Sequence, residues 1–424
     1  MRLWQWKELN NMNNKLKKIN TIATLAALGV ALIIGFLIPD FASKIKFFGD
    51  WYIQSLKVVI SPVIFLSMSL FVLQREKGQK FIIGKAIVIF IIMFVVTFLM
   101  ASLVVWIFQP GAGFESGSST PIGSQADFSI DKILLNLLPK SFEDFFYGKC
   151  VFFVIVVALL VAFIISFTPI KEKCAAGLTF CKKYVDLILK AIIFLTPLAV
   201  LSLVSNMIAN YDVETFTMSI KYVLFAYGLS LATILLVMIL PVWIIAKVNP
   251  ITYIRKVARV WLMSISTCSS VATLPYTIKC CNESFGVDEK ITNVVVPLGC
   301  TIHMCGGAIS FSLLGFFVAQ LNGVTVTLPM FMLMLLSSVL INMAAPGIPG
   351  GGVVIGFTYL NIFGFELESF YGLYAAMYKL LDMSYTTLNV TGDISANILL
   401  NHFEEKKRKK LETKAIENKL EQNN

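Results

Sequence analysis

Residues 381–393 read LDMSYTTLNVTGD, and this stretch decides how the chain folds and where it acts. At about 100° per residue, a helix places the fourth, seventh and eleventh residues after Asp382 within roughly 40° of it. Those residues are Thr386, Asn389 and Asp393. Two carboxylates and an amide therefore share one helical face. Because an ionised group inside a bilayer is costly unless it faces a cavity, a partner or a cation, this face is predicted to be a functional site.

The chain around this helix has the composition of a membrane protein with several spans. Of its 424 residues, 57% are hydrophobic and 14% are charged, whereas soluble domains carry about 25% charged residues. A water-soluble enzyme is therefore excluded. A spanning helix needs about 20 apolar residues, and uncharged runs of about that length recur. They cover residues 19–39, 58–74, 86–114, 150–170, 191–211, 222–246, 260–278 and, longer than any single span, 291–365.

The Lys and Arg residues predict the orientation of the chain in the membrane. They gather in 1–18, 75–85, 171–183 and 247–259, which we expect in the cytoplasm together with the tail at 403–424. Both termini are thus predicted to be cytoplasmic, and the protein is predicted to lie in a plasma membrane. The compactness of the chain alone favours a bacterial inner membrane. The first apolar run is interpreted as a retained helix, not a signal peptide. The net charge of +10 comes from these connections and a solvated tail, so we expect the lipid bilayer, not nucleic acid, as a partner.

Two apolar segments are interrupted in a way that continuous helices do not tolerate. Residues 264–275 read SISTCSSVATLP, and residues 342–352 read NMAAPGIPGGG. Proline and glycine disrupt the helix, and free backbone groups at membrane depth persist only beside protein or a water-filled cavity. The two segments indicate re-entrant hairpins at a transporter binding site. Two kinked helices packed through small residues are the alternative.

Three residues near these segments are unusual inside a membrane. His303 and Cys305 lie in the interrupted stretch 299–308, but residues two apart usually point in different directions, so a catalytic Cys–His pair is not expected. His303 is interpreted as a hydrogen-bonded or proton-titrating cavity group. Lys379 lies one turn before Asp382 and either pairs with it or extends outward. The cysteines show no metal-ligand spacing and are interpreted as reduced, buried residues.

Six short motifs are distributed along the chain. They are SPVIFLSMSL at 61–70, FQPGAGF at 108–114, SSVATLPYT at 269–277, PLGCTIHMCGG at 297–307, GIPGGG at 347–352 and LDMSYTTLNVTGD at 381–393. In this order they resemble the dicarboxylate/amino acid:cation symporter family, which includes the glutamate transporters and the neutral amino-acid exchangers. The resemblance covers about residues 20–402.

The resemblance implies an all-α membrane protein with eight transmembrane helices and two re-entrant helical hairpins, arranged as inverted repeats. It further implies a homotrimer, in which each transport domain moves like an elevator against a scaffold. The implied divisions are a cytoplasmic segment at 1–18, scaffold helices at 19–81, a transport-domain helix at 82–114, scaffold helices at 115–215 with an extracellular loop at 115–149, a transport domain at 216–402 with hairpins at 252–278 and 325–362, and the basic tail at 403–424.

The resemblance also implies roles for single residues. Asp382 would hold the α-amino group of an amino acid and Asn389 its α-carboxylate, beside Thr386 on the same face. The hairpin tips would enclose this substrate through Ser269 and Ser270 and through the segment containing Ala345, Pro346, Gly347 and Gly350. The residues implied to hold Na+ are Asp393, Asn389, Gly299, Thr301, Met304 and His303.

The chain departs from acidic-substrate members of the family at one decisive position. Those members carry an arginine three residues after the amino-binding Asp, where its guanidinium can pair with a side-chain carboxylate. This chain has Tyr385 there, and Cys268 where some relatives have a first-hairpin arginine. A neutral amino acid resembling serine, alanine or threonine is therefore predicted, with Tyr385 beside its side chain. The alternatives are an acidic amino-acid or dicarboxylate symporter that uses Lys379 as the missing cation, and an ion or anion channel; a membrane enzyme is not expected.

The cation ligands depart from the family pattern as well. The family motif asparagine-methionine-aspartate-glycine-threonine is replaced here by residues 303–307, HMCGG, and the oxygen ligands of a third sodium are replaced by Phe90, Met93 and Phe94. Because a hard cation needs oxygen ligands, we predict fewer than three Na+ per cycle, with H+ as a further candidate coupling ion. Protonated His303 or the Lys379 ammonium would replace the lost charge. The glutamate of potassium-countertransporting relatives is replaced by Phe311, which excludes potassium antiport through that position.

Overall fold

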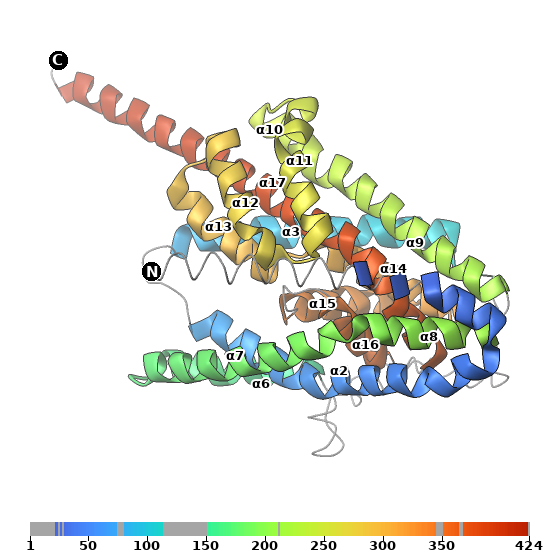
Figure 1. The fold of residues 1–424 in the computed structure, drawn as a ribbon. Coiled ribbons are helices and arrows are strands. Elements are labelled where there is room, and N and C mark those ends of the chain that lie inside the picture. Colours follow the sequence, from blue (N-terminus) through green and yellow to red (C-terminus); the bar gives the residue numbers. More distant parts are fainter. Residues whose placement is uncertain are drawn as a thin grey trace, which may run out of the picture.

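The computed structural model describes residues 22–23, 26–27, 29–73, 80–112, 151–210, 213–344, 351–363 and 368–422. Within these ranges the chain is helical apart from short turns and connections, and no strand occurs (Figure 1). The all-α prediction is confirmed for this part of the chain. The predicted cytoplasmic segment at 1–18, the loop at 115–149 and the second hairpin tip at 345–350 lie outside the described residues.

The helices follow one another with short connections in the described ranges. In chain order they are α2 (Pro39–Leu73), α3 (Lys80–Phe108), α6 (Val151–Ser166), α7 (Lys171–Phe194), α8 (Thr196–Asn210), α9 (Val213–Thr233), the π-helical turn η1 (Ile234–Ile239), α10 (Leu240–Ala246), α11 (Pro250–Thr267), α12 (Ser270–Lys279), the π-helical turn η2 (Cys280–Ser284), α13 (Glu289–Ile302), α14 (Cys305–Leu321), α15 (Leu328–Ala344), α16 (Gly351–Ile362) and α17 (Glu368–Gln422).

Several of these helical segments are long and apolar enough to cross a bilayer. Among the described residues they are Ile82–Phe108, Thr217–Ala246 and Glu289–Leu321. A further candidate is the pair Lys171–Ile192 and Thr196–Asn206, which is bent by 44° as a broken span or a re-entrant segment would be. Membrane-length apolar helices are thus present as predicted, while the number of eight spans stays a prediction.

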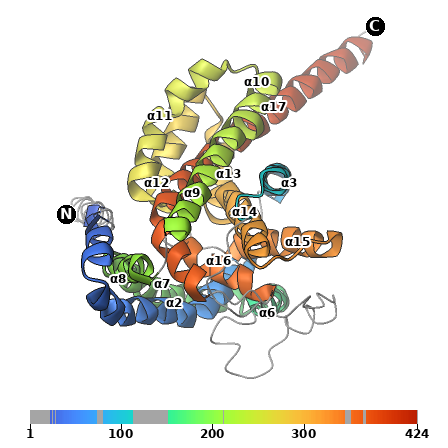
Figure 2. The same cartoon turned by 90° about the vertical axis from the view of Figure 1, so that its right-hand side faces the viewer.

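The helices pack in two groups. α2 lies along α6, α7 and α8, and these four run side by side in the lower part of Figure 1. In the other group α17 packs against α9, α11, α13 and α14, and α3 packs against α14. The groups meet where α17 touches α8 and where α15 and α16 contact helices of both. Figure 2 shows α16 between α2 and the upper group, so the hairpin formed by α15 and α16 lies at the junction.

Two helix breaks determine which side chains meet at this junction. α11 ends at Cys268, whose φ of 47° is left-handed, and Ser269 is extended and caps α12 by accepting a hydrogen bond from Ala272 N at 3.2 Å. α13 ends at Ile302, and the next residues, His303 and Met304, have φ angles of −107° and −123° and ψ angles of 92° and 81°. The chain is therefore extended for two residues before α14 begins.

α17 does not end with the predicted membrane segment but continues through the basic tail to Gln422. The tail is rich in Lys and Glu, which favour helix, and Arg408 and Glu412 form an i,i+4 ion pair at 3.9 Å. At the start of the tail Glu404 pairs with Lys85 in the first turns of α3. The end of α17 projects away from the other helices in Figure 1.

Candidate substrate and cation site

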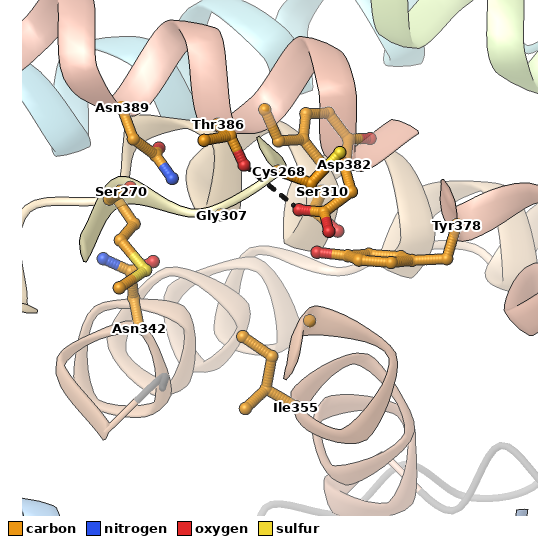
Figure 3. Close-up of a pocket in the computed structure, with 13 residues that line it drawn as sticks. Cys268, Ser270, Gly307, Ser310, Asn342, Ile355, Tyr378, Asp382, Thr386 and Asn389 are labelled. Carbon is orange, nitrogen blue, oxygen red and sulfur yellow. Dashed lines mark hydrogen bonds between the residues drawn. The ribbon is translucent and has the colours of Figure 1, made fainter. Parts of the chain in front are cut away.

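A small cavity lies where α17 meets the tips of the broken helices (Figure 3). Its volume is about 40 Å³, which is room for roughly three water molecules at about 10–15 Å³ each. Four elements besides α17 contribute side chains, namely the α11–α12 tip, α14, α15 and α16. The lining residues are Cys268, Ser270, Met304, Gly307, Ser310, Asn342, Gly352, Ile355, Tyr378, Asp382, Tyr385, Thr386 and Asn389.

Asp382 is the charged residue among these thirteen. Its side chain is directed into the cavity, and Thr386 Oγ1 donates a hydrogen bond to Asp382 Oδ1 at 3.2 Å from the next turn of α17 (Figure 3). Asp382 is only 6% exposed. A buried carboxylate of this kind attracts a cationic group strongly, because little water is present to compete for it.

Asn389 lies two turns further along the same face of α17. Its Oδ1 accepts a hydrogen bond from Gly306 N at 2.7 Å. The amide nitrogen is therefore the part of the side chain that faces the cavity, as Figure 3 shows. An amide nitrogen donates hydrogen bonds, so Asn389 offers a donor to an anionic or polar group in the cavity.

The first turns of three helices also face this cavity. Ser270 is the first residue of α12, Gly307 lies in the first turn of α14 and Gly352 lies in that of α16, and all three line the cavity. The backbone N–H groups of a first helical turn have no partner within the helix and carry a partial positive charge. In α14, however, Gly306 N donates to Asn389 Oδ1 and Gly307 N donates to Met304 O at 2.8 Å. The cavity thus combines one carboxylate with the weakly positive first turns of α12 and α16. Ser269 does not line it and instead caps α12.

Several lining residues were not expected from the sequence, among them Asn342 on α15 and Tyr378 on α17. Asn342 is 2% exposed, and its Oδ1 has no hydrogen-bond partner among the described residues. Gly307 lies so close that a Cβ atom there would collide with Asn342 Oδ1. A sequence signal existed for Asn342, because it is an amide within an uncharged run just before the Pro–Gly segment.

A second polar cluster lies one to two turns beyond the cavity on α17. Asp393 Oδ1 is 2.9 Å from His303 Nδ1, and His303 Nε2 is 3.0 Å from Cys305 Sγ. Phe90 of α3 stacks on the imidazole with ring centroids 4.4 Å apart and planes inclined by 11°. The Asp393 and His303 side chains are 2% and 0% exposed.

The contact between His303 and Cys305 corrects the expectation that their side chains point in different directions. That expectation assumed helical geometry, whereas residues 303–304 are extended and turn both side chains toward each other. The two residues are buried, and Cys305 does not line the cavity. The arrangement therefore gives no substrate access to the thiol, which agrees with the prediction that it is not a catalytic pair.

The other predicted cation ligands are distributed differently. Gly299 O accepts a hydrogen bond from His303 N at 2.8 Å. Thr301 is exposed, and its Oγ1 donates to Leu298 O at 2.8 Å. Met304 lines the substrate cavity. The structure thus brings Gly299, His303 and Asp393 together and leaves Thr301 apart.

The remaining predicted site residues can be placed as follows. Ala345, Pro346, Gly347 and Gly350 lie outside the described residues. Lys379 is half-buried beside Cys268 and is not among the residues lining the cavity.

The chain matches one family model over most of its length. The model is that of the Sodium:dicarboxylate symporter family, and the match covers residues 21–403. The Bacillus caldotenax protein named proton/sodium-glutamate symport protein is 26% identical over 403 residues, which are 88% of this chain and 93% of that protein.

Animal relatives match over shorter stretches. The human protein named neutral amino acid transporter A is 31% identical over 179 residues, which are 42% of this chain and 34% of that protein. A Caenorhabditis elegans protein named excitatory amino acid transporter is 32% identical over 161 residues, which are 38% of this chain and 32% of that protein. The match thus spans about a third of the length of these animal relatives.

Proposed function

Because the chain belongs to the sodium:dicarboxylate symporter family, we propose that it is a secondary active symporter that carries a neutral amino acid across the membrane together with a cation. The family consists of transporters, so the prediction that the chain is not an enzyme is confirmed. The proposed substrate resembles serine, alanine or threonine. The proposed cycle is an elevator movement of a transport domain against a scaffold within a homotrimer.

The charge pattern of the cavity carries this proposal. An α-amino acid presents one ammonium and one carboxylate, and the cavity presents one carboxylate, Asp382, and the donors of Asn389 and of the first turns of α12 and α16. The ammonium would pair with Asp382 and the substrate carboxylate would receive the donors, as anions do at helix N-termini. The single positive charge and the single negative charge of the substrate are then each matched by a group of the cavity.

A second negative charge on the substrate finds no counterpart in this cavity. Arg and Lys are absent from the thirteen lining residues, and the position at which acidic-substrate members carry arginine is the buried Tyr385. A second carboxylate would therefore be desolvated without a cation, which is costly. This supports a neutral substrate over aspartate, glutamate or a dicarboxylate.

The alternative is an acidic amino acid carried by the same fold. It is favoured by the Bacillus caldotenax relative, whose printed name includes glutamate and whose match covers 88% of this chain. In that case Lys379, beside Cys268, would have to move toward the cavity. The same relative's name includes both proton and sodium, so the coupling ion is proposed only as Na+ or H+.

Uptake into proteoliposomes tests the proposal. Labelled serine, alanine, threonine and aspartate are supplied with and without an inward Na+ gradient, at two pH values. We expect uptake of the neutral substrates driven by a cation gradient and no uptake of aspartate. Aspartate uptake would establish the alternative, and a substrate-independent current would indicate a channel.

A further inference from the structure

Three residues that the family resemblance assigns to sodium binding have oxygen atoms already engaged by neighbouring donors. Gly299 O accepts from His303 N at 2.8 Å, and Asn389 Oδ1 accepts from Gly306 N at 2.7 Å. Asp393 Oδ1 lies 2.9 Å from His303 Nδ1. All three donors come from the break between α13 and α14 and the first turn after it. The broken segment therefore supplies donors where a cation would need acceptors.

The His303 side chain also fills the space beside the carboxylate. Phe90 stacks on one face of its ring at 4.4 Å, and Cys305 Sγ lies 3.0 Å from Nε2. On the other side, Gly299 lies so close that a Cβ atom there would collide with Asp393 Oδ1. Na+ is a hard cation and needs several oxygen ligands, whereas a phenyl ring, a thiol and an imidazole supply none. The surroundings of Asp393 Oδ1 therefore do not fit a sodium ion.

We propose that His303 is the permanent partner of Asp393 and that this carboxylate binds no Na+ in this protein. One placement of hydrogens satisfies the whole chain of contacts, with Cys305 donating its S–H to Nε2 and Nδ1–H donating to Asp393 Oδ1. The coupling cation of the symport cycle then binds elsewhere. The inference rests on the proposed function only in calling that ion the coupling cation.

The first test compares the thermal stability of the purified full chain in NaCl and in choline chloride at equal ionic strength. Asp393→Asn keeps an oxygen acceptor for His303 and removes the charge that a sodium ion would need. We expect wild type and D393N to show the same Na+-specific shift in Tm. A Na+-specific shift in wild type that D393N abolishes would overturn the inference. Asp186→Asn, at the partly exposed pair with Lys182, is the matched control.

The second test removes the imidazole with His303→Asn, which leaves a shorter side chain with a carbonyl oxygen beside Asp393. We expect this variant to gain a Na+-specific rise in Tm of about 2–4 °C at Na+ well above its dissociation constant. The gain should disappear in H303N/D393N. A folded H303N variant without the gain would overturn the part of the inference that names His303, and not Phe90 or Cys305, as the group that excludes the ion. If H303N does not fold, the D393N comparison decides alone.

Neither stability measurement requires transport, so the two proposals can fail separately. A chain that takes up none of the four labelled amino acids would contradict the proposed function, and the comparison of Na+ and choline would still decide the role of His303. Neutral amino-acid uptake whose Na+ dependence is lost only in D393N, and not in D186N, would retain the proposed function and overturn the inference.

Discussion

Two buried carboxylates on α17 have opposite surroundings. Asp382 and Asp393 are eleven residues apart, about 16 Å along the helix, and they are 6% and 1% exposed. Asp382 borders a cavity and accepts a hydrogen bond from Thr386, which belongs to its own helix. Asp393 is not among the residues that line this cavity, and its partner His303 comes from the break between α13 and α14.

This difference separates a carboxylate that lines a cavity from one that is bonded to an imidazole from another part of the chain. Because Asp382 lines the cavity, its carboxylate is placed to meet a ligand there. A side chain held by His303 cannot release its partner without disturbing Phe90 and Cys305 as well. Burial and charge alone do not distinguish the two carboxylates, whereas the cavity beside Asp382 and the imidazole beside Asp393 do.

Removing the charge of Asp382 should have the largest effect. Asp382→Asn keeps the size of the side chain but removes the ion pair with the substrate ammonium in a buried cavity. We expect a loss of about 4 kcal/mol, or roughly 1,000-fold in the substrate dissociation constant. Titration calorimetry or substrate-induced thermal stabilisation measures it. Asp186→Asn, which removes a partly exposed carboxylate, should bind substrate normally. Unchanged binding by D382N would place the ammonium elsewhere.

The sequence predicts the surroundings of Asp382 better than those of Asp393. Helical periodicity places Asp382, Thr386 and Asn389 on one face, and the structure brings all three to one cavity. Periodicity is local, however, and the partner of Asp393 depends on a break at His303 that turns its ring toward α17.

The same limit applies to lining residues contributed by other helices. Asn342 reaches the cavity from α15, and nothing in the spacing along α17 indicates it. The helix break at Cys268–Ser269 lies within the interrupted segment 264–275 that the sequence predicts. Which helix faces that tip is not visible there.

The next largest effect is expected when His303, the partner of Asp393, is removed. His303→Ala leaves the Asp393 carboxylate buried without its partner, and we expect a loss of about 3 kcal/mol in stability. Thermal unfolding of the purified chain measures it. H303A/D393N should recover part of the loss, because no charge is then left unpaired, and this coupling identifies the pair. Equal destabilisation of H303A and the double variant would contradict a direct interaction.

An intermediate effect is expected from adding a charge to the substrate cavity. Tyr385→Arg places a guanidinium where acidic-substrate relatives of this family carry one, and such a fork can pair with a second carboxylate. We expect aspartate binding to strengthen by at least about 10-fold, or 1.4 kcal/mol, and serine binding to weaken. Competition between labelled serine and unlabelled aspartate measures the ratio. Tyr385→Phe, which keeps the ring, should retain the neutral preference. Aspartate binding by wild type as tight as by Y385R would remove the basis for a neutral substrate.

The smallest effect is expected from changing a third set of polar contacts on α17. These contacts involve no charged residue and none of the residues that line the cavity. Tyr253, Trp261 and Ser264 of α11 bond to Ser395, Thr391 and Thr387 at 2.7, 2.8 and 2.9 Å. Residues 387, 391 and 395 repeat every four positions, on a face centred roughly 180° from Asp382. These bonds hold α11, and with it the tip that carries Ser270, along α17.

Tyr253→Phe tests whether the polar contacts between α11 and α17 affect substrate selectivity or only hold α11 in position. The variant removes one hydroxyl that is fully buried and bonded to Ser395, so we expect a loss of about 1 kcal/mol in stability and an unchanged ratio of serine to aspartate binding. Tyr227→Phe is the control, because Tyr227 also bonds to α17, through Leu380 O at 2.8 Å, but is 41% exposed. Its loss should be smaller, since water can replace the bond. A change of substrate preference in Y253F would mean that the α11 contacts shape the cavity. The comparison of the two α17 carboxylates, one lining the cavity and one paired with His303, would then be incomplete.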